Sequence, residues 1–192
     1  HNPTGAVLSK EELGQIADFA KANNLLVVSD EAYDRLLYDG LEHRSIASEP
    51  GMRDRTVILG SFSKTYSMTG WRIGYLAGPA EVIRGMALLQ QSFVLSVNSF
   101  AQWGAVEAMT GPQDCVEEMR QQFDIRRKAM MEALSTIPNV SFAAPKGAFY
   151  IYLNHEKTGL DPVQFCAKLL DEYYVACVPG SEYGPYAGCN TR

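Results

Sequence analysis

The segment 60–74 concentrates residue types that can do chemistry. It reads GSFSKTYSMTGWRIG, and it places Lys64, two serines (Ser61 and Ser63) and Arg72 in a short stretch that follows an apolar, β-branched run. A lysine amine can attack carbonyl groups, and a planar guanidinium can bind a phosphate through two parallel hydrogen bonds. The segment therefore predicts either a phosphate site or covalent chemistry at Lys64.

A nucleoside-triphosphate loop is one interpretation of this segment. Such a loop needs the pattern GxxxxGK[ST], because its second glycine lets the backbone amides close around the phosphates. Here Ser63 stands before the lysine, and Gly60 lies four residues before it. The stretch 25–31, LLVVSDE, resembles the magnesium-binding strand of such ATPases, but it precedes the lysine. The missing glycine argues against a nucleoside triphosphatase.

A carboxylate belongs to the same predicted site. Asp30 ends one short apolar run, and Ser61 and Lys64 lie just past the end of another. Ligands of α/β proteins bind outside the carboxyl ends of the strands, so we expect these side chains at one edge of a sheet. Lysine, acid, hydroxyl and arginine together suit pyridoxal 5'-phosphate, which a lysine holds as a Schiff base while an acid pairs with its pyridine nitrogen.

Four motifs extend this set across nearly the whole chain. They are NPTG at 2–5, SDEAY at 29–33, SFSKTYSMTGWRIG at 61–74 and PGSEYG at 179–184. In this order they resemble the class I/II aminotransferases of the aspartate aminotransferase fold. The resemblance implies a three-layer α/β/α large domain with a mostly parallel sheet, and a smaller α+β domain. It also implies that the chain corresponds to roughly the C-terminal half of such a protein.

The resemblance assigns catalytic roles by motif. Lys64 is similar to the lysine that forms the Schiff base and moves the proton between the substrate Cα and the cofactor C4′. Asp30 is similar to the acid that keeps the pyridine nitrogen protonated. Tyr33 and Asn2 are similar to the pair that hydrogen-bonds the 3-oxygen of the ring. A cis Asn2–Pro3 peptide bond is expected in the same turn.

Phosphate and substrate contacts follow from the same motifs. Ser61, Ser63 and Arg72 resemble the phosphate ligands. Arg192 resembles the arginine that pairs with the substrate α-carboxylate, and Asn2 is also expected to bind substrate. Taken singly, each residue also has an ordinary structural role, such as a helix cap for Ser61 or a salt bridge for Arg72. Together and in this order, they favour the cofactor site.

The resemblance implies transfer of an amino group between an amino acid and a 2-oxo acid, in a homodimer. Another reaction on the same scaffold, of the carbon–sulfur lyase or aminocyclopropane-carboxylate synthase type, remains open at this point. An inactive truncated chain also remains open. The pocket for the substrate side chain lies largely outside these motifs, so the amino acid is not specified.

The elements that must position these residues form two predicted domains. The first, 1–113, alternates helices and strands, and its opening helix is preceded by a capping box, Ser9 to Glu12. Its expected helices are 9–23, 79–91 and 99–109, and its expected strands are 25–28, 56–59 and 73–77, all of the buried parallel type.

The second predicted domain, 114–192, is a smaller α+β unit that is incomplete at its C-terminus. A long charged helix over 114–135 is expected to turn residues 126–128 toward solvent. Asp161 and Pro162 predict a helix N-terminus. The expected helices are 114–135 and 161–173, and the expected strands are 140–142, 147–153 and 174–178.

Composition limits the class of protein. The chain has 192 residues, 46% hydrophobic and 20% charged, with a formal net charge of −5. This favours a packed core and argues against nucleic-acid binding, which usually needs a basic face. No apolar run approaches the ~20 residues of a membrane span. The four cysteines lack CxxC spacing, and the three histidines are scattered, so no metal site is expected and a cytoplasmic location is predicted.

Overall fold

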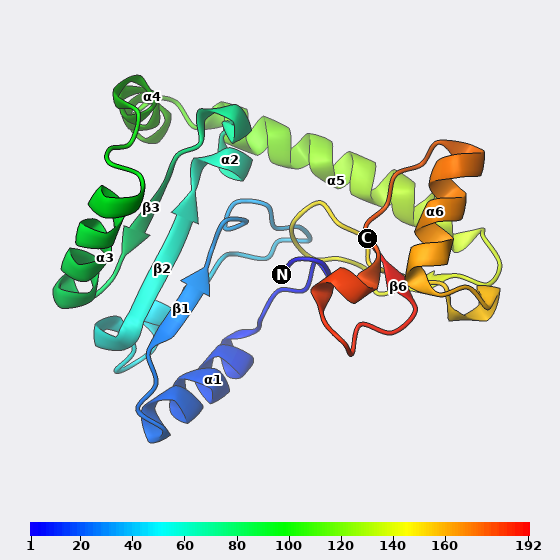
Figure 1. Cartoon of the computed structure of the whole chain (residues 1–192), viewed down its shortest axis with the longest axis horizontal. Coiled ribbons are helices and arrows are strands. Elements are labelled where there is room, and N and C mark those ends of the chain that lie inside the picture. Colours follow the sequence, from blue (N-terminus) through cyan, green and yellow to red (C-terminus); the bar gives the residue numbers. More distant parts are fainter. The chain divides into compact units, whose positions relative to one another are not determined.

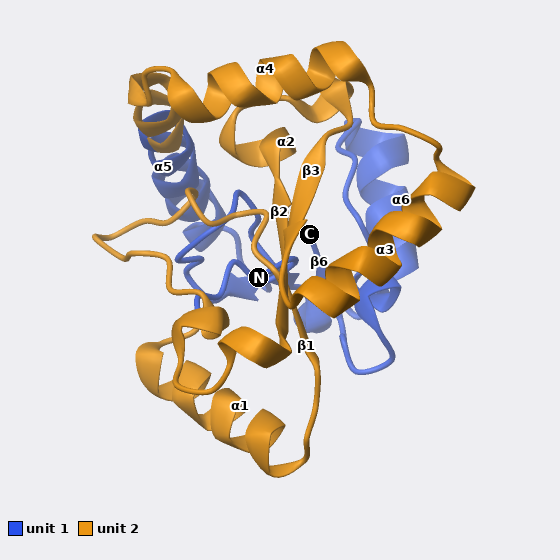
Figure 2. Cartoon of the chain, turned by 90° about the vertical axis from the view of Figure 1, so that its left-hand side faces the viewer, with its two compact units in different colours: residues 1–7, 121–192 blue, residues 8–120 orange.

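A computed structural model describes all residues, 1–192. The chain forms two compact units, coloured separately in Figure 2. Unit 1 comprises His1–Val7 and Gln121–Arg192, and unit 2 comprises Leu8–Arg120. The predicted domains, 1–113 and 114–192, stay a prediction about the intact protein.

Unit 2 is built on a three-stranded sheet of order β1-β2-β3 (Figure 1). Its strands are β1 (Val27–Asp30), β2 (Thr56–Ser61) and β3 (Gly74–Ala77). β1 and β2 are parallel, with Asp30 opposite Leu59. The carboxyl ends of these two strands therefore meet at one edge, as the sequence predicts.

The direction of β3 differs from the prediction. β3 runs antiparallel to β2, with Gly74 opposite Ser61, whereas the sequence analysis expects a third strand of the parallel type. A parallel connection needs a crossover, usually through a helix that packs on the sheet. The segment between β2 and β3 holds only one helical turn and one 3-10 turn, so the chain reverses at the same edge.

The helices of unit 2 follow the predicted pattern closely. Ser9 caps α1: its hydroxyl accepts from the Glu12 amide at 3.2 Å, and its amide donates to the Glu12 carboxylate at 2.7 Å. This is the predicted capping box. The helices are α1 (Lys10–Ala22), α2 (Phe62–Thr65), α3 (Ala80–Phe93) and α4 (Ser99–Thr110), with 3-10 turns at Ile46–Ser48, Arg53–Arg55 and Thr69–Trp71.

Two apolar clusters hold these elements. The first joins α1 to the loop that follows β1, and its buried members are Leu13, Ala17, Ala20, Ile46 and Met52. The second joins the segment 62–73 to α4, and its buried members are Phe62, Met68, Ile73, Ala101 and Ala105. Figure 2 shows the sheet edge-on, with α1 and α3 on opposite sides of it. The second cluster fixes the segment that carries Lys64.

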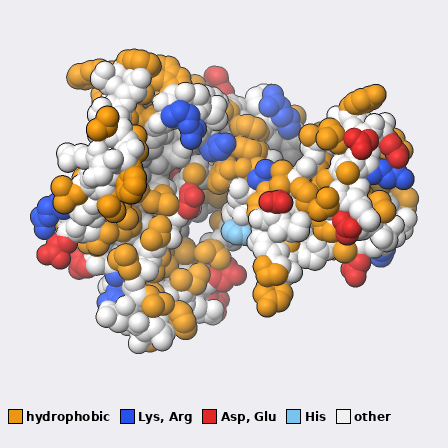
Figure 3. Space-filling view, viewed as in Figure 1, with side chains coloured by type: hydrophobic (Ala, Val, Ile, Leu, Met, Phe, Trp, Pro, Cys, Tyr) orange, Lys and Arg blue, Asp and Glu red, His pale blue; other side chains and the backbone are white.

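Large apolar side chains are exposed on α3 and α4 (Figure 3). Phe93 is 83% exposed, and Trp103 is 74% exposed. A patch of this kind marks a surface that another protein segment can cover. None of the helices combines the length and the apolar character needed to cross a membrane.

Unit 1 contains an antiparallel sheet of order β4-β5-β6. The Asp161 carboxylate caps α6 by accepting from the amides of Val163 and Gln164, both at 2.9 Å, and Pro162 opens the helix as predicted. The elements are α5 (Asp114–Ser135, whose last residues belong to this unit), β4 (Ser141–Phe142), β5 (Leu153–Asn154), α6 (Pro162–Tyr173) and β6 (Asn190–Thr191), with 3-10 turns at Glu156–Thr158 and Gly180–Tyr183.

Two predicted strands of unit 1 are wrong or much shorter. The expected strand 147–153 survives only in β5, because Ala148 adopts a left-handed φ of 58° that interrupts the extended backbone. The expected strand 174–178 is absent, since Tyr174 caps α6 with φ 58°. Within 174–178, only Val178 pairs as in an antiparallel strand, because its amide and its carbonyl both hydrogen-bond to the backbone of Arg192.

Arg127 also departs from the expectation that residues 126–128 face solvent. Its side chain is buried, and its guanidinium donates to Asp124 at 2.8 Å and to the Pro145 carbonyl at 2.7 Å. A guanidinium is tolerated inside when every donor group finds such partners. The periodicity of α5 alone could not show that the segment around Pro145 covers this position.

Candidate cofactor and substrate site

The edge at the carboxyl ends of β1 and β2 collects most of the predicted residues. Asp30 is the last residue of β1, and Ser61 is the last residue of β2. Lys64 follows in α2, and Ser63 precedes it in the same turn. Because Gly74 pairs with Ser61, Arg72 lies two residues outside the sheet at this edge. The structure thus brings five predicted residues of unit 2 to one edge.

Asp30 presents an exposed carboxylate there. Its Oδ1 accepts from the Ala32 amide at 3.1 Å, while the neighbouring Glu31 amide donates to the Leu59 carbonyl at 2.9 Å. The local turn thereby holds the Asp30 side chain in one direction. Tyr33 is half-buried in the next turn, where its carbonyl accepts from the Leu36 amide at 3.0 Å.

Ser61 and Ser63 are half-buried at the start of α2. The Ser61 hydroxyl accepts from the Ser63 amide at 3.2 Å and caps the turn. Lys64 is the third residue of this turn and is also half-buried. The two hydroxyls and the amine are therefore held within one helical turn.

Arg72 sits in a left-handed conformation, with φ 53° and ψ 51°. This conformation costs a residue with a side chain about 1–2 kcal/mol, and glycine would adopt it without that cost. The exposed guanidinium donates to the Thr69 carbonyl at 2.8 Å. The turn therefore carries an arginine where backbone geometry favours glycine, which points to a use for the side chain.

Asn2 and Arg192 meet in unit 1, although 190 positions separate them. Arg192 Nη1 donates to Asn2 Oδ1 at 2.9 Å. The Asn2–Pro3 peptide bond is cis, as the sequence analysis expects. The structure therefore brings together the two residues predicted to bind the substrate.

Two aromatic rings flank Arg192, and neither was predicted as a site residue. The guanidinium carbon lies 4.5 Å from the Tyr150 ring centre and 5.4 Å from that of Tyr183. Cation–π contacts of this kind orient the planar guanidinium. Tyr150 lies in the expected strand 147–153, and Tyr183 lies in the motif PGSEYG, so only the motif indicated that its tyrosine could belong to the site.

Gly5 holds the NPTG turn to the rest of unit 1. Its carbonyl accepts from the amides of Lys146 and Gly147 at 2.8 and 2.9 Å. A Cβ at Gly5, whose φ is 67°, would lie 2.4 Å from the Pro145 Cβ. Glycine is therefore required for the close approach that places Asn2.

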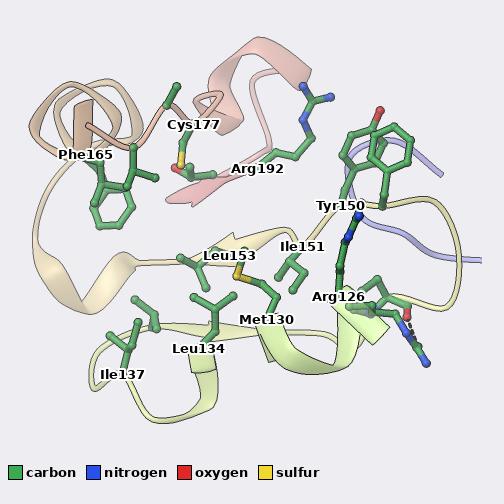
Figure 4. A pocket seen from close by; sticks show the side chains of 18 of the residues that line it. Arg126, Met130, Leu134, Ile137, Tyr150, Ile151, Leu153, Phe165, Cys177 and Arg192 are labelled. Carbon is green, nitrogen blue, oxygen red and sulfur yellow. Dashed lines mark hydrogen bonds between the residues drawn. The ribbon is translucent and has the colours of Figure 1, made fainter. Parts of the chain in front are cut away.

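An apolar cavity of about 820 Å³ adjoins Arg192 in unit 1. Figure 4 shows Arg192 and Tyr150 at one end, and Leu134 and Ile137 toward the other. Burial raises the pKa of Cys177 in its wall. No carboxylate, lysine or histidine lines the cavity.

A polar cluster around Glu31, the residue that follows Asp30 at the end of β1, was not predicted. The Glu31 carboxylate accepts from the hydroxyls of Ser45 at 2.6 Å and Ser29 at 3.0 Å, and it bonds the His43 ring at 2.8 Å. Burial alone would raise the pKa of Glu31, but the hydrogen bonds from His43 and Ser45 outweigh it and lower the pKa. The bond to Glu31 raises the pKa of His43. This cluster anchors the loop after β1.

The donor set of unit 2 fits pyridoxal 5'-phosphate. Lys64 supplies an amine for the aldehyde, and Asp30 supplies a carboxylate for the ring nitrogen. Tyr33 supplies a phenol, and the serine hydroxyls and Arg72 supply donors for the phosphate. The exposed Asp30 and Arg72 at the same edge provide opposite charges for the two ends of such a molecule.

Comparison with known proteins agrees with this chemistry. A family model described as "Aminotransferase class I and II" matches residues 1–189. An aspartate aminotransferase of Bacillus sp. (strain YM-2) is 44% identical over 189 residues, which are 95% of this chain and 48% of that protein. An aromatic-amino-acid aminotransferase 2 of Thermococcus litoralis is 42% identical over 188 residues, which are 96% of this chain and 48% of that protein.

Solved structures show the same likeness. The crystal structure of an aromatic aminotransferase from Pyrococcus horikoshii OT3 superposes with a TM-score of 0.95 at 42% identity, covering 100% of this chain and 52% of that one. The chain spans about half the length of the curated relatives it matches. The fold of that portion, and the family match over nearly every residue, lead to one conclusion: the chain belongs to the class I and II aminotransferase family.

Proposed function

We propose that the intact protein is a pyridoxal-phosphate-dependent aminotransferase that transfers an amino group between an amino acid and a 2-oxo acid through a Schiff base at Lys64. The observation that carries this proposal is the edge of unit 2 where Lys64, Asp30 and Arg72 converge. When bound, the cofactor supplies an electron-accepting ring that stabilises the charge left when a proton leaves the substrate Cα.

Lys64 and Asp30 have different tasks in this proposal. The Lys64 amine takes the proton from the substrate Cα and delivers it to the cofactor C4′, which is general acid–base catalysis by a positioned amine. The Asp30 carboxylate holds a proton on the ring nitrogen, because an opposite charge within ion-pair distance favours the protonated form. The Tyr33 phenol and the Asn2 amide are proposed to hydrogen-bond the 3-oxygen of the ring.

The remaining residues bind and orient. Arg72 presents a fork that matches two phosphate oxygens, and the hydroxyls of Ser61 and Ser63 donate to the same group. Arg192, held by Asn2 and by two tyrosine rings, is suited to pair with the α-carboxylate of the substrate. Homodimer formation stays a prediction of the resemblance, and a cytoplasmic location stays a prediction from the cysteine pattern.

Trapping the cofactor tests this proposal. The intact protein is incubated with pyridoxal phosphate and reduced with borohydride, and the modified peptide is mapped. We expect the label on Lys64 and its loss in Lys64→Ala. Lys128→Ala, an exposed lysine paired with Asp124, is the matched control and should keep the label.

A second step separates transamination from other chemistry. Adding an amino acid to the loaded protein should convert the cofactor to pyridoxamine phosphate and release a 2-oxo acid. Label on another lysine would refute the role of Lys64. Label on Lys64 without pyridoxamine phosphate would instead favour a lyase-type reaction on the same scaffold.

A further inference from the structure

α2 is too short to position Lys64 by itself. It spans only Phe62–Thr65, and the Tyr66 amide closes it by donating to the Phe62 carbonyl at 3.1 Å. A single turn of helix fixes several backbone angles for very few hydrogen bonds and is not stable alone. The orientation of this turn must therefore come from contacts of its side chains.

Two buried side chains anchor the turn on either side of Lys64. Phe62 is 4% exposed and packs in the second apolar cluster. Thr65 is 5% exposed, and its Oγ1 donates to Asp34 Oδ1 at 3.1 Å. Residues three apart share a helix face, so Phe62 and Thr65 face inward together, and Lys64 projects about 100° away from Thr65. Rotation of the turn would redirect Lys64.

The Asp34 end of this bond belongs to the turn that carries Tyr33. The Asp34 amide donates to the Glu31 carbonyl at 3.1 Å, and the Leu36 amide donates to the Tyr33 carbonyl at 3.0 Å. Leu36 is fully buried and holds the turn in place. The Nε of Arg35 lies 3.8 Å from the Asp34 carboxylate. The Thr65 hydroxyl, at 3.1 Å, therefore lies nearer to the Asp34 carboxylate than the Arg35 Nε does.

We propose that the hydrogen bond between Asp34 and Thr65 is a positioning contact that sets Lys64 relative to Tyr33. This inference rests on the proposed function, because Tyr33 and Lys64 then act on neighbouring atoms of one cofactor. The contact joins the residue after Tyr33 to the residue after Lys64, across 31 positions of sequence. A hydroxyl that donates to a carboxylate in a partly buried place makes a directional, charge-assisted bond. Neither residue contacts the cofactor in this proposal.

The first measurement needs no cofactor. Thr65→Val keeps the shape of the side chain and removes its hydroxyl, while Thr65→Ser keeps the hydroxyl and is the matched control. Hydrogen exchange at the Tyr66 amide, which closes α2, should be at least about tenfold faster in Thr65→Val than in the wild type. Thr65→Ser should stay within about threefold of the wild type.

The second measurement reads the placement of Lys64. In the loaded intact protein, the absorption of the Lys64–cofactor linkage is titrated against pH. We expect its midpoint to shift by at least about half a pH unit in Thr65→Val, because the hydrogen bond from Tyr33 to the ring oxygen is weakened. Thr65→Ser should restore the wild-type midpoint. A purely structural role would lower the melting temperature and leave this midpoint unchanged.

Asp34→Asn tests the same contact from its other end, where the side chain is 30% exposed and the fold tolerates change more readily. It keeps an acceptor but removes the charge, so an intermediate shift of the midpoint is expected. Borohydride label on Lys64 with wild-type midpoints in Thr65→Val and Asp34→Asn would overturn this inference alone. Absence of label on Lys64 in the wild type would overturn both this inference and the proposed function.

Discussion

Replacing Glu31 with glutamine probes the polar cluster that anchors the loop after β1. The Glu31 side chain is only 10% exposed and receives two hydroxyl hydrogen bonds and one from His43. Both serine hydroxyls donate to Glu31 Oε1, and His43 bonds Oε2. A glutamine carbonyl oxygen at the Oε1 position can keep both serine bonds, but only as bonds to a neutral group, and the bond to a charged acceptor at His43 is lost. Hydrogen bonds to a charged group are worth about 1.5–3 kcal/mol each.

The His43 bond contributes at the low end of that range. The His43 side chain is 34% exposed, and solvent screening weakens an ion pair of that kind. We therefore expect Glu31→Gln to lower the free energy of unfolding of unit 2 by about 2–4 kcal/mol near pH 5.5. This is a large share of the stability of a typical domain.

The loss of unfolding free energy in Glu31→Gln should depend on pH in a defined direction. The lowered pKa of Glu31 contributes stability that is present above its unfolded value of 4.5 and is lost as pH falls through the folded pKa. The raised pKa of His43 contributes stability that is present below its unfolded value of 6.5 and is lost as pH rises through the folded pKa. The difference between wild type and Glu31→Gln is therefore greatest between those two values and shrinks on either side.

The assay is urea unfolding of the chain followed by tryptophan fluorescence. Both tryptophans, Trp71 and Trp103, lie in unit 2, so the signal reports the unit that contains Glu31. Glu42→Gln is the matched control, because it makes the same charge change at an exposed position of the same loop. Equal stability of Glu31→Gln and Glu42→Gln near about pH 5.5, or a deficit that is constant with pH, would refute the reasoning.

Three further predictions follow from single residues. Asp30→Asn should slow proton transfer from the substrate at least about a hundredfold in single-turnover experiments while the cofactor stays bound, and a normal rate would make Asp30 a structural acid only. Arg72→Gly relieves a left-handed φ of 53°, so the cofactor-free variant should be as stable as the wild type or up to about 1 kcal/mol more stable. The same variant should bind the cofactor at least about tenfold more weakly in equilibrium dialysis, and unchanged binding would contradict the phosphate role of Arg72. The His155 side chain is fully buried, stacks on Phe165 and has no hydrogen-bond partner for either ring nitrogen. Burial lowers the pKa of His155, so its contribution to stability is lost as pH falls below the unfolded value of 6.5. Relative to the wild type, His155→Phe should therefore slow hydrogen exchange of the α6 amides more at acid pH than at neutral pH. An equal slowing at both pH values would contradict this prediction.

Local patterns in the sequence were sufficient to predict several elements of the fold. The capping box before α1 and the Asp161–Pro162 start of α6 involve residues within one turn of each other, so the sequence contains the whole interaction. The placement of Asp30 and Ser61 at one edge follows from two short apolar runs joined by a long connection, which favours parallel pairing. The motif pattern likewise singled out Lys64 and Arg72 as chemically unusual.

Tertiary structure decided what depends on partners distant in the chain. The reversal of β3, the burial of Arg127 under Pro145 and the interruption at Ala148 all depend on segments that the local pattern does not include. The contact between Thr65 and Asp34 is likewise set by how the backbone folds back. Hydrophobic periodicity and capping act over a few residues, whereas these contacts need two segments to approach in space, and only the packed chain specifies which segments do so.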